Sequence, residues 1–121
     1  MTIPRSIIRL AVACTGLCAI PGCGPERKQS VPAAQIAADP KLAEGQSSFM
    51  HHCHQCHPRG GGGLAPGIVD KPLPALAIKT QVRQGVGTMP AFSERHISDQ
   101  ELDALVAYIQ VLRDQPPLAS R

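Results

Sequence analysis

The clearest hydrophobic pattern lies near the C-terminal end of the 121-residue chain. The apolar residues there recur at helical spacing, and they are Leu102, Leu105, Val106, Ile109 and Leu112. Ser98 and Glu101 precede them with the spacing of a capping box, which bonds free amides of a first helical turn. Pro116 and Pro117 follow and cannot continue a helix. The pattern therefore predicts a helix that begins near Ser98 and ends before Pro116.

A second helical pattern occupies the middle of the chain. Asp39 is a suitable N-cap, and Pro40 suits the first helical position because it lacks an amide hydrogen. One face of the predicted helix then carries Leu42, Gly45, Phe49 and Cys53. We expect this helix to run into residues 53–57 and to stop at Pro58.

A shorter helix is predicted from Leu73 to Gln84. Pro74 fits its first turn, Ile78 and Val82 share a face, and Gly85 follows its end.

The segments between these helices lack a regular pattern. Residues 59–66 contain four successive glycines, and we expect them to be too flexible for regular structure. Pro90 favours an extended backbone at Met89. No segment alternates apolar and polar residues as a strand does, so the predicted fold class is all-α, with three main helices.

The first residues have the features of an export signal. Arg5 and Arg9 precede an apolar run over 10–20 that is too short to span a bilayer. Residues 20–23 then resemble a bacterial lipoprotein site, in which a small residue precedes a lipidated cysteine, here Cys23. In the alternative interpretation, Cys23 is incidental in a simple secretory signal or an uncleaved anchor. Both interpretations place the protein outside the cytoplasm.

Composition and length indicate how the chain divides into segments and leave room for one small domain. Proline and polar residues follow the signal without periodicity and predict a tether, with a reach on the order of 20 Å. The expected segments are a signal peptide over 1–23, a flexible tether over 24–38, one domain over 39–115 and a tail over 116–121.

The predicted domain is poor in large apolar side chains. The chain has no Trp, one Tyr and two Phe. So small a domain usually needs a disulfide, metal or cofactor to be stable. We therefore expect the chain without its cofactor to be largely disordered. The 12 basic residues barely exceed the 9 acidic ones, and no basic patch argues for nucleic acid.

The sequence Cys53-His54-Gln55-Cys56-His57 is the motif that carries chemistry. It has the C-x-x-C-H spacing of c-type haem attachment. Two thiols on one helical turn can each add to a vinyl group on one porphyrin edge. The histidine that follows the second thiol can then ligate the iron.

Several short motifs occur in the same order as in the class I c-type cytochromes, the small monohaem kind, and the chain resembles that family from about Asp39 to Arg113. The matching residues are Gly45 and Phe49, the C-x-x-C-H motif, Ala65-Pro66-Gly67, Val82-Arg83-x-Gly85, Met89-Pro90-Ala91-Phe92 and Tyr108 in the last helix. The resemblance implies the cytochrome c fold, three main helices wrapped around one covalently bound haem c. It also implies that Gly45, Phe49 and Tyr108 lie where the first and last helices cross.

The resemblance assigns a role to each site residue. Cys53 and Cys56 would form the thioethers, and His57 would be the proximal iron ligand. The Pro66 carbonyl would accept a hydrogen bond from the other ring nitrogen of His57, and so orient it. Arg83 would contact a haem propionate, unless it is simply a solvated surface charge.

Met89 is the candidate for the sixth ligand, because a neutral thioether favours reduced iron and the extended backbone allows close approach. Alternatively, Met89 only fills a gap in the core. Met50 lies on the attachment helix itself and cannot easily compete, whereas His96 could in principle replace Met89. The remaining histidines, His51, His52 and His54, are expected to be solvated.

The leading functional hypothesis is a single-electron carrier that is no enzyme by itself, because His/Met ligation leaves no open position for substrate. Three alternatives remain open. The first is a five-coordinate haem protein that binds gas or peroxide. The second is a thiol–disulfide oxidoreductase at Cys53 and Cys56, although that motif normally follows a strand. The third is a zinc site built from Cys53, Cys56, His57 and another histidine, although no downstream ligand pair completes it.

The expected partners are redox proteins: a membrane oxidase, a reductase or a periplasmic dehydrogenase. We expect a monomer on the periplasmic side, held at the membrane as a lipoprotein through Cys23. Such tethering would raise its concentration near membrane redox complexes.

Overall fold

A computed structural model describes residues 27–119, so the predicted signal peptide and Cys23 lie outside the described residues. Its helices, in chain order, are α1 (Ala33–Ala38), α2 (Pro40–His52), the 3-10 helix η1 (Pro58–Gly60), α3 (Ala75–Gln84) and α4 (Asp99–Arg113). Over residues 27–119 there is no strand, only two isolated bridges. The predicted all-α class is confirmed. No helix within this range is long and apolar enough to cross a membrane.

Local capping explains where α2 and α4 begin. The Asp39 side chain accepts hydrogen bonds from the amides of Lys41 at 2.9 Å and Leu42 at 3.4 Å. Ser98 Oγ accepts from the Glu101 amide at 3.2 Å. Each bond satisfies an amide that the first helical turn leaves without a partner. Both predicted helix starts are therefore confirmed.

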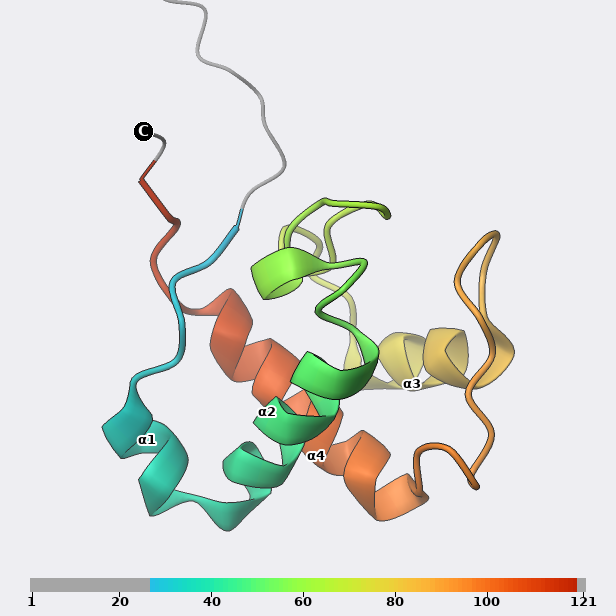
Figure 1. The fold of residues 1–121 in the computed structure, drawn as a ribbon, viewed down its shortest axis with the longest axis horizontal. Coiled ribbons are helices and arrows are strands. Elements are labelled where there is room, and N and C mark those ends of the chain that lie inside the picture. The colour runs from blue at the N-terminus through green and yellow to red at the C-terminus, as the bar shows by residue number, and fades with distance from the viewer. Residues whose placement is uncertain (1–26, 120–121) are drawn as a thin grey trace, which may run out of the picture.

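The crossing of α2 and α4 forms the centre of the fold (Figure 1). Gly45 allows this close approach, because a Cβ atom there would overlap the carbonyl oxygen of Ala104 and lie 2.8 Å from Tyr108 Cβ. The rings of Phe49 and Tyr108 pack 5.4 Å apart, centroid to centroid. The predicted contact of Gly45, Phe49 and Tyr108 is thus present.

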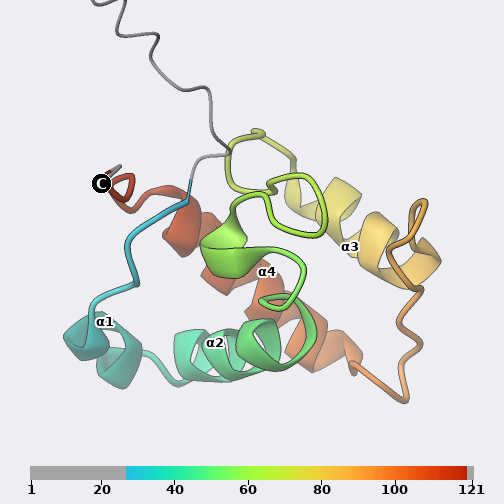
Figure 2. The same ribbon diagram turned by 45° about the horizontal axis from the view of Figure 1, so that its top comes forward.

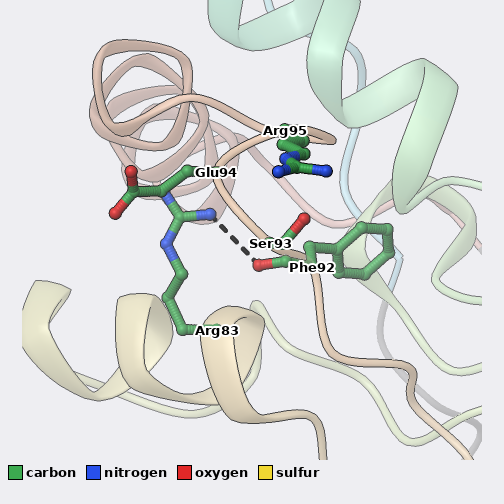
Figure 3. Close-up of a pocket in the computed structure, with 5 residues that line it drawn as sticks. All are labelled: Arg83, Phe92, Ser93, Glu94 and Arg95. Atoms are coloured by element: carbon green, nitrogen blue, oxygen red, sulfur yellow. Dashed lines mark hydrogen bonds between the residues drawn. The ribbon is translucent and has the colours of Figure 1, made fainter.

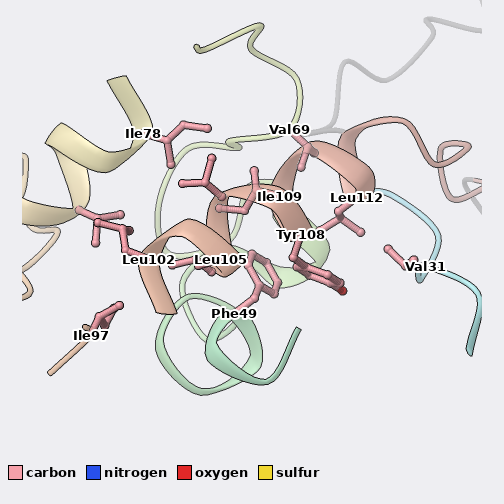
Figure 4. Packing of buried hydrophobic residues seen from close by; sticks show 12 residues of the cluster. Val31, Phe49, Val69, Ile78, Ile97, Leu102, Leu105, Tyr108, Ile109 and Leu112 are labelled. Atoms are coloured by element: carbon pink, nitrogen blue, oxygen red, sulfur yellow. The ribbon is translucent and has the colours of Figure 1, made fainter. Parts of the chain in front are cut away.

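The hydrophobic core surrounds α4 (Figure 4). Its largest fully buried side chains are Phe49 from α2, Ile97 from the segment before α4, and Leu105 and Leu112 from α4 itself. Helix α3 adds Ile78 and Val82. It begins two residues later than predicted, with Pro74 as its N-cap. Its C-cap is Gly85, whose positive φ of 71° suits glycine.

The structure corrects the predicted tether. Residues 33–38 form α1, and Val31 is buried in the core. The Gln29 amide donates to Pro116 O at 2.9 Å, and the Leu118 amide donates to Arg27 O at 2.8 Å. Figures 1 and 2 both show this N-terminal segment beside the segment that follows α4. Pairing with the predicted C-terminal tail therefore orders residues 27–38, which have no strong pattern of their own.

The glycine-rich loop is also more ordered than predicted. Gly60 closes η1 with a φ of 74°, and it is buried against Val69. Its carbonyl accepts the amides of Ile68 at 2.8 Å and Val69 at 3.1 Å. Small residues let the loop fold back on itself, so that residues 65–68 lie against the turn that follows α2.

Candidate functional site

The five residues of the C-x-x-C-H motif continue from α2 as a hydrogen-bonded turn. The Cys53 amide donates to Phe49 O at 2.9 Å, and the His57 amide donates to Cys53 O at 2.9 Å. Cys53 is half-buried and Cys56 is exposed, and neither forms a disulfide. The close packing of α2 on α4 therefore determines where the turn, its thiols and its imidazole lie.

His57 is held by the backbone of the glycine-rich loop. Its Nδ1 lies 2.9 Å from Pro66 O, the contact that the family resemblance implied. The loop is fixed to the turn by the Ala65 amide, which donates to Cys56 O at 3.3 Å. Because a carbonyl oxygen only accepts, Nδ1 must carry the proton of a neutral ring. The lone pair is then on Nε2, which is the form that ligates a metal.

A cavity lies between this turn, α3 and the segment that follows α3. Cys53, His57 and Met89 all line it. Most of its wall is apolar and includes Ile68, Leu73, Ile78, Val82, Val86 and Ile109. The thiol, the imidazole and the thioether thus open onto one apolar space.

Met89 is half-buried and reaches this cavity from residues 86–97, a segment without a helix. Its amide donates to Val86 O at 2.9 Å, and its carbonyl accepts the Val86 amide at 3.2 Å. These bonds close a tight turn that presents the thioether. Met50 lies on α2 with 49% of its surface exposed and is not part of the cavity wall.

The other histidines do not line the cavity. His96 is exposed and its Nδ1 lies 3.0 Å from Ser93 Oγ. His52 contacts Glu101 at 3.8 Å, and His54 accepts the Arg59 amide at 3.3 Å. Over residues 27–119 no three or more His, Cys, Asp or Glu side chains are grouped as a metal site. The zinc hypothesis therefore gains no support from these residues.

Cys53 is poorly suited to thiol exchange. Burial, and secondarily the neighbouring Cys56, raises the pKa of the Cys53 thiol to about 12. A thiol needs to ionise to attack a disulfide, and reactive cysteines have lowered pKa values. A helix also precedes the motif where the oxidoreductase hypothesis requires a strand.

Arg83 has protein partners that the sequence did not predict. Arg83 is not part of the cavity wall, and its guanidinium lies against the chain after Met89 (Figure 3). It donates to Phe92 O at 3.1 Å and Ile97 O at 2.7 Å, and it pairs with Asp99 at 2.6 Å. These bonds use three of the five N–H groups of the guanidinium, and none of the three acceptor residues is part of the cavity wall.

Sequence reasoning missed two polar residues of the cavity wall. They are Lys71, whose Nζ donates to Gly67 O at 2.8 Å, and Gln81 on α3. Gln81 lies three positions after Ile78, so its helical position could have placed it beside that buried face. Lys71 lies in an irregular loop and has no comparable local signal.

The donor set fits haem c. The motif supplies two thiols at the spacing needed for two thioether bonds, and His57 offers Nε2 as a ligand. The apolar wall suits a flat apolar macrocycle.

Comparison with known proteins decides the family. The family described as "Cytochrome C oxidase, cbb3-type, subunit III" matches residues 40–109. Cytochrome c6 of Bryopsis maxima is 36% identical over 78 residues, which cover 56% of this chain and 88% of the relative. The chain belongs to the class I c-type cytochromes. It is an electron carrier with covalently bound haem c.

Two further relatives agree. The cytochrome c subunit of 4-cresol dehydrogenase [hydroxylating] from Pseudomonas putida is 32% identical over 82 residues, 68% of this cytochrome and 72% of the relative. Cytochrome c6 of Cyanidioschyzon merolae is 35% identical over 82 residues, 60% of this cytochrome and 74% of the relative. The partners of a protein in this family are other redox proteins.

Proposed function

We propose that this cytochrome passes single electrons between redox proteins outside the cytoplasm, with its iron held by His57 and Met89. One observation carries the proposal: an imidazole and a thioether from two separate segments line the same apolar cavity. The Pro66 carbonyl fixes the tautomer of His57 in the ligating form.

When bound, haem c supplies an iron that takes up and releases one electron. The chain's own residues hold the ligands in place and give the cavity a mostly apolar wall. His57 is anchored by its backbone and by Pro66, and Met89 is held in the turn with Val86. With both ligands in place there is no open position for a substrate, so we propose no enzymatic activity for the chain alone.

The relatives indicate which classes of redox protein exchange electrons with this cytochrome. One relative is the cytochrome subunit of a dehydrogenase, and the matching family is a subunit of a terminal oxidase. We propose that this cytochrome exchanges electrons with a periplasmic dehydrogenase, a reductase or a membrane oxidase.

We also propose that Cys23 is lipidated and holds the cytochrome at the periplasmic side of the membrane. Because residues from Arg27 onward pair with the domain, only residues 24–26 separate it from Cys23. Three extended residues span only about 10 Å. The domain would then stay close to the membrane surface. Cys23→Ser should release the cytochrome from the membrane fraction, and a variant that stays bound would contradict the anchor.

The first experiment is a haemochrome spectrum of the exported protein after extraction with acidified acetone. Haem colour that stays with the polypeptide shows thioether linkage at Cys53 and Cys56. Colour that passes into the solvent would contradict covalent attachment.

Ligation by Met89 is tested with Met89→Ala. This variant should lose the weak near-red absorption band of a thioether on ferric iron, and its reduction potential should fall by on the order of 0.1 V. Met50→Ala is the matched control on the surface of α2 and should change neither property. An unchanged band and potential in Met89→Ala would favour another ligand or a five-coordinate iron.

A further inference from the structure

The contacts of Arg83 join three parts of the chain. Arg83 lies in the last turn of α3, and its Nη1 donates to Phe92 O at 3.1 Å and to Ile97 O at 2.7 Å. Its Nη2 pairs with Asp99 Oδ1 at 2.6 Å, at the start of α4. Figure 3 shows the side chain reaching from α3 to the Phe92 carbonyl. One guanidinium thus ties α3 to both ends of residues 92–99.

Phe92 is held on both sides of its backbone. Its amide donates to Val82 O at 2.9 Å, and its carbonyl accepts from Arg83. Consecutive residues of α3 therefore fix one residue of the following segment. Met89 lies three positions earlier, in the turn closed with Val86. Since residues 86–97 form no helix, these few bonds determine where the thioether lies.

The three contacts of Arg83 are not equal. The Asp99 side chain is 78% exposed, and exposed ion pairs contribute little because water and salt screen them. The Arg83 side chain is only 23% exposed, and Ile97 is fully buried. Hydrogen bonds from a charged donor to partly buried carbonyls are stronger than neutral ones. The carbonyl bonds should therefore carry most of the effect.

We propose that Arg83 is a positioning residue for the sixth iron ligand: by holding the carbonyls of Phe92 and Ile97, it keeps the Met89 segment against the cavity. The proposal rests on the proposed ligation by Met89. It differs from the propionate role that the family resemblance implied, because Arg83 would act through the backbone carbonyls that it binds.

The test measures how easily imidazole displaces Met89 from ferric iron in the holoprotein, followed by loss of the near-red band. Displacement requires the segment to move, so a weaker hold lets imidazole bind more tightly. Arg83→Gln should lower the imidazole dissociation constant about tenfold, equivalent to about 1.4 kcal/mol. Arg83→Lys keeps the charge but not the two-carbonyl geometry, and it should give a partial rescue. If Arg83→Gln yields no holoprotein, the imidazole dissociation constants of Arg83→Lys and wild type are compared instead.

Two controls separate positioning from charge and from general stability. Arg95→Gln makes the same charge change at an exposed residue of the same segment, and it should leave imidazole binding unchanged. Asp99→Asn removes the charge of the exposed ion pair, and it should change the imidazole dissociation constant less than about twofold. Denaturant unfolding of each holoprotein gives global stability separately.

Wild-type imidazole binding in both Arg83 variants would overturn the proposal. An equal effect in Arg95→Gln or Asp99→Asn would also overturn it, because charge or the ion pair would then explain the result. Absence of the thioether band in the wild type would show instead that ligation by Met89 has failed. A wild type with the band and Arg83 variants without an effect would refute the positioning role alone.

Discussion

The two segments that supply the proposed iron ligands are held in different ways. His57 follows α2, which is packed closely on α4 at Gly45 and through the tilted contact between the rings of Phe49 and Tyr108. Met89 lies in an irregular segment that is anchored in the core at Ile97, whereas around Met89 it is held by partial packing, a few backbone bonds and Arg83. Packing against a core is cooperative with folding, whereas a few hydrogen bonds can be lost locally. We therefore expect the segment with His57 to lose its position only when the whole domain unfolds, whereas the segment with Met89 can detach locally.

The largest expected effect comes from removing the haem that both sides share. The double variant Cys53→Ala with Cys56→Ala should lose most of its helical signal and show no cooperative thermal transition. The reason is that the apolar cavity wall would lose its partner and so small a core is marginal by itself. Circular dichroism during heating measures this. A cooperative transition in the haem-free variant would show that the α2–α4 crossing is stable alone.

Alanine substitutions at two glycines, one in each region, compare how much each region contributes to the free energy of unfolding. Gly45→Ala should reduce the free energy of unfolding by about 3 kcal/mol, because the new Cβ overlaps the Ala104 carbonyl and forces α2 from α4. Gly87→Ala in the Met89 segment meets no atom within 4 Å, and its φ of 59° costs only about 1 kcal/mol. Denaturant titration of both holoproteins gives the two values. Equal losses would remove the proposed difference between the regions.

The smallest expected effect concerns His52, which lies between the two regions against Phe92 and Glu101. Burial first, then the nearby charge of His51, lowers the pKa of His52, with Glu101 opposing and His96 adding to the shift. The unfolded chain therefore binds this proton more readily, and the contribution of His52 to stability is lost as pH falls below about 6.5.

This loss is measured from unfolding midpoints at about pH 7.5 and about pH 5. His52→Gln should reduce the decrease in the midpoint between these two conditions. The same decrease in wild type and variant would contradict the assignment.

Local signals in the sequence were enough to predict the main helices and one side of the site. Asp39 and Ser98 cap α2 and α4 through bonds within a single turn. The C-x-x-C-H motif acts over five residues, and the family resemblance supplied the Pro66 contact. Met89 lines the same cavity, and its ligation of the iron stays a prediction.

Contacts between distant segments could not be predicted in the same way. Residues 27–38 are ordered by pairing with the C-terminal segment, as in the bond from Gln29 to Pro116, and nothing near Val31 in sequence indicates its burial. The bonds from Arg83 to the backbone carbonyls of Phe92 and Ile97 could not be predicted either.

The sequence by itself therefore determined the all-α class, the haem attachment turn and the two residues proposed as iron ligands. These depend on side-chain chemistry and on bonds that close within a few residues. Only the tertiary structure decided the order of the N-terminal segment, the folding of the glycine-rich loop and the contacts of Arg83. Backbone carbonyls are the same at every position, so which of them an arginine can reach depends on the folded path of the chain.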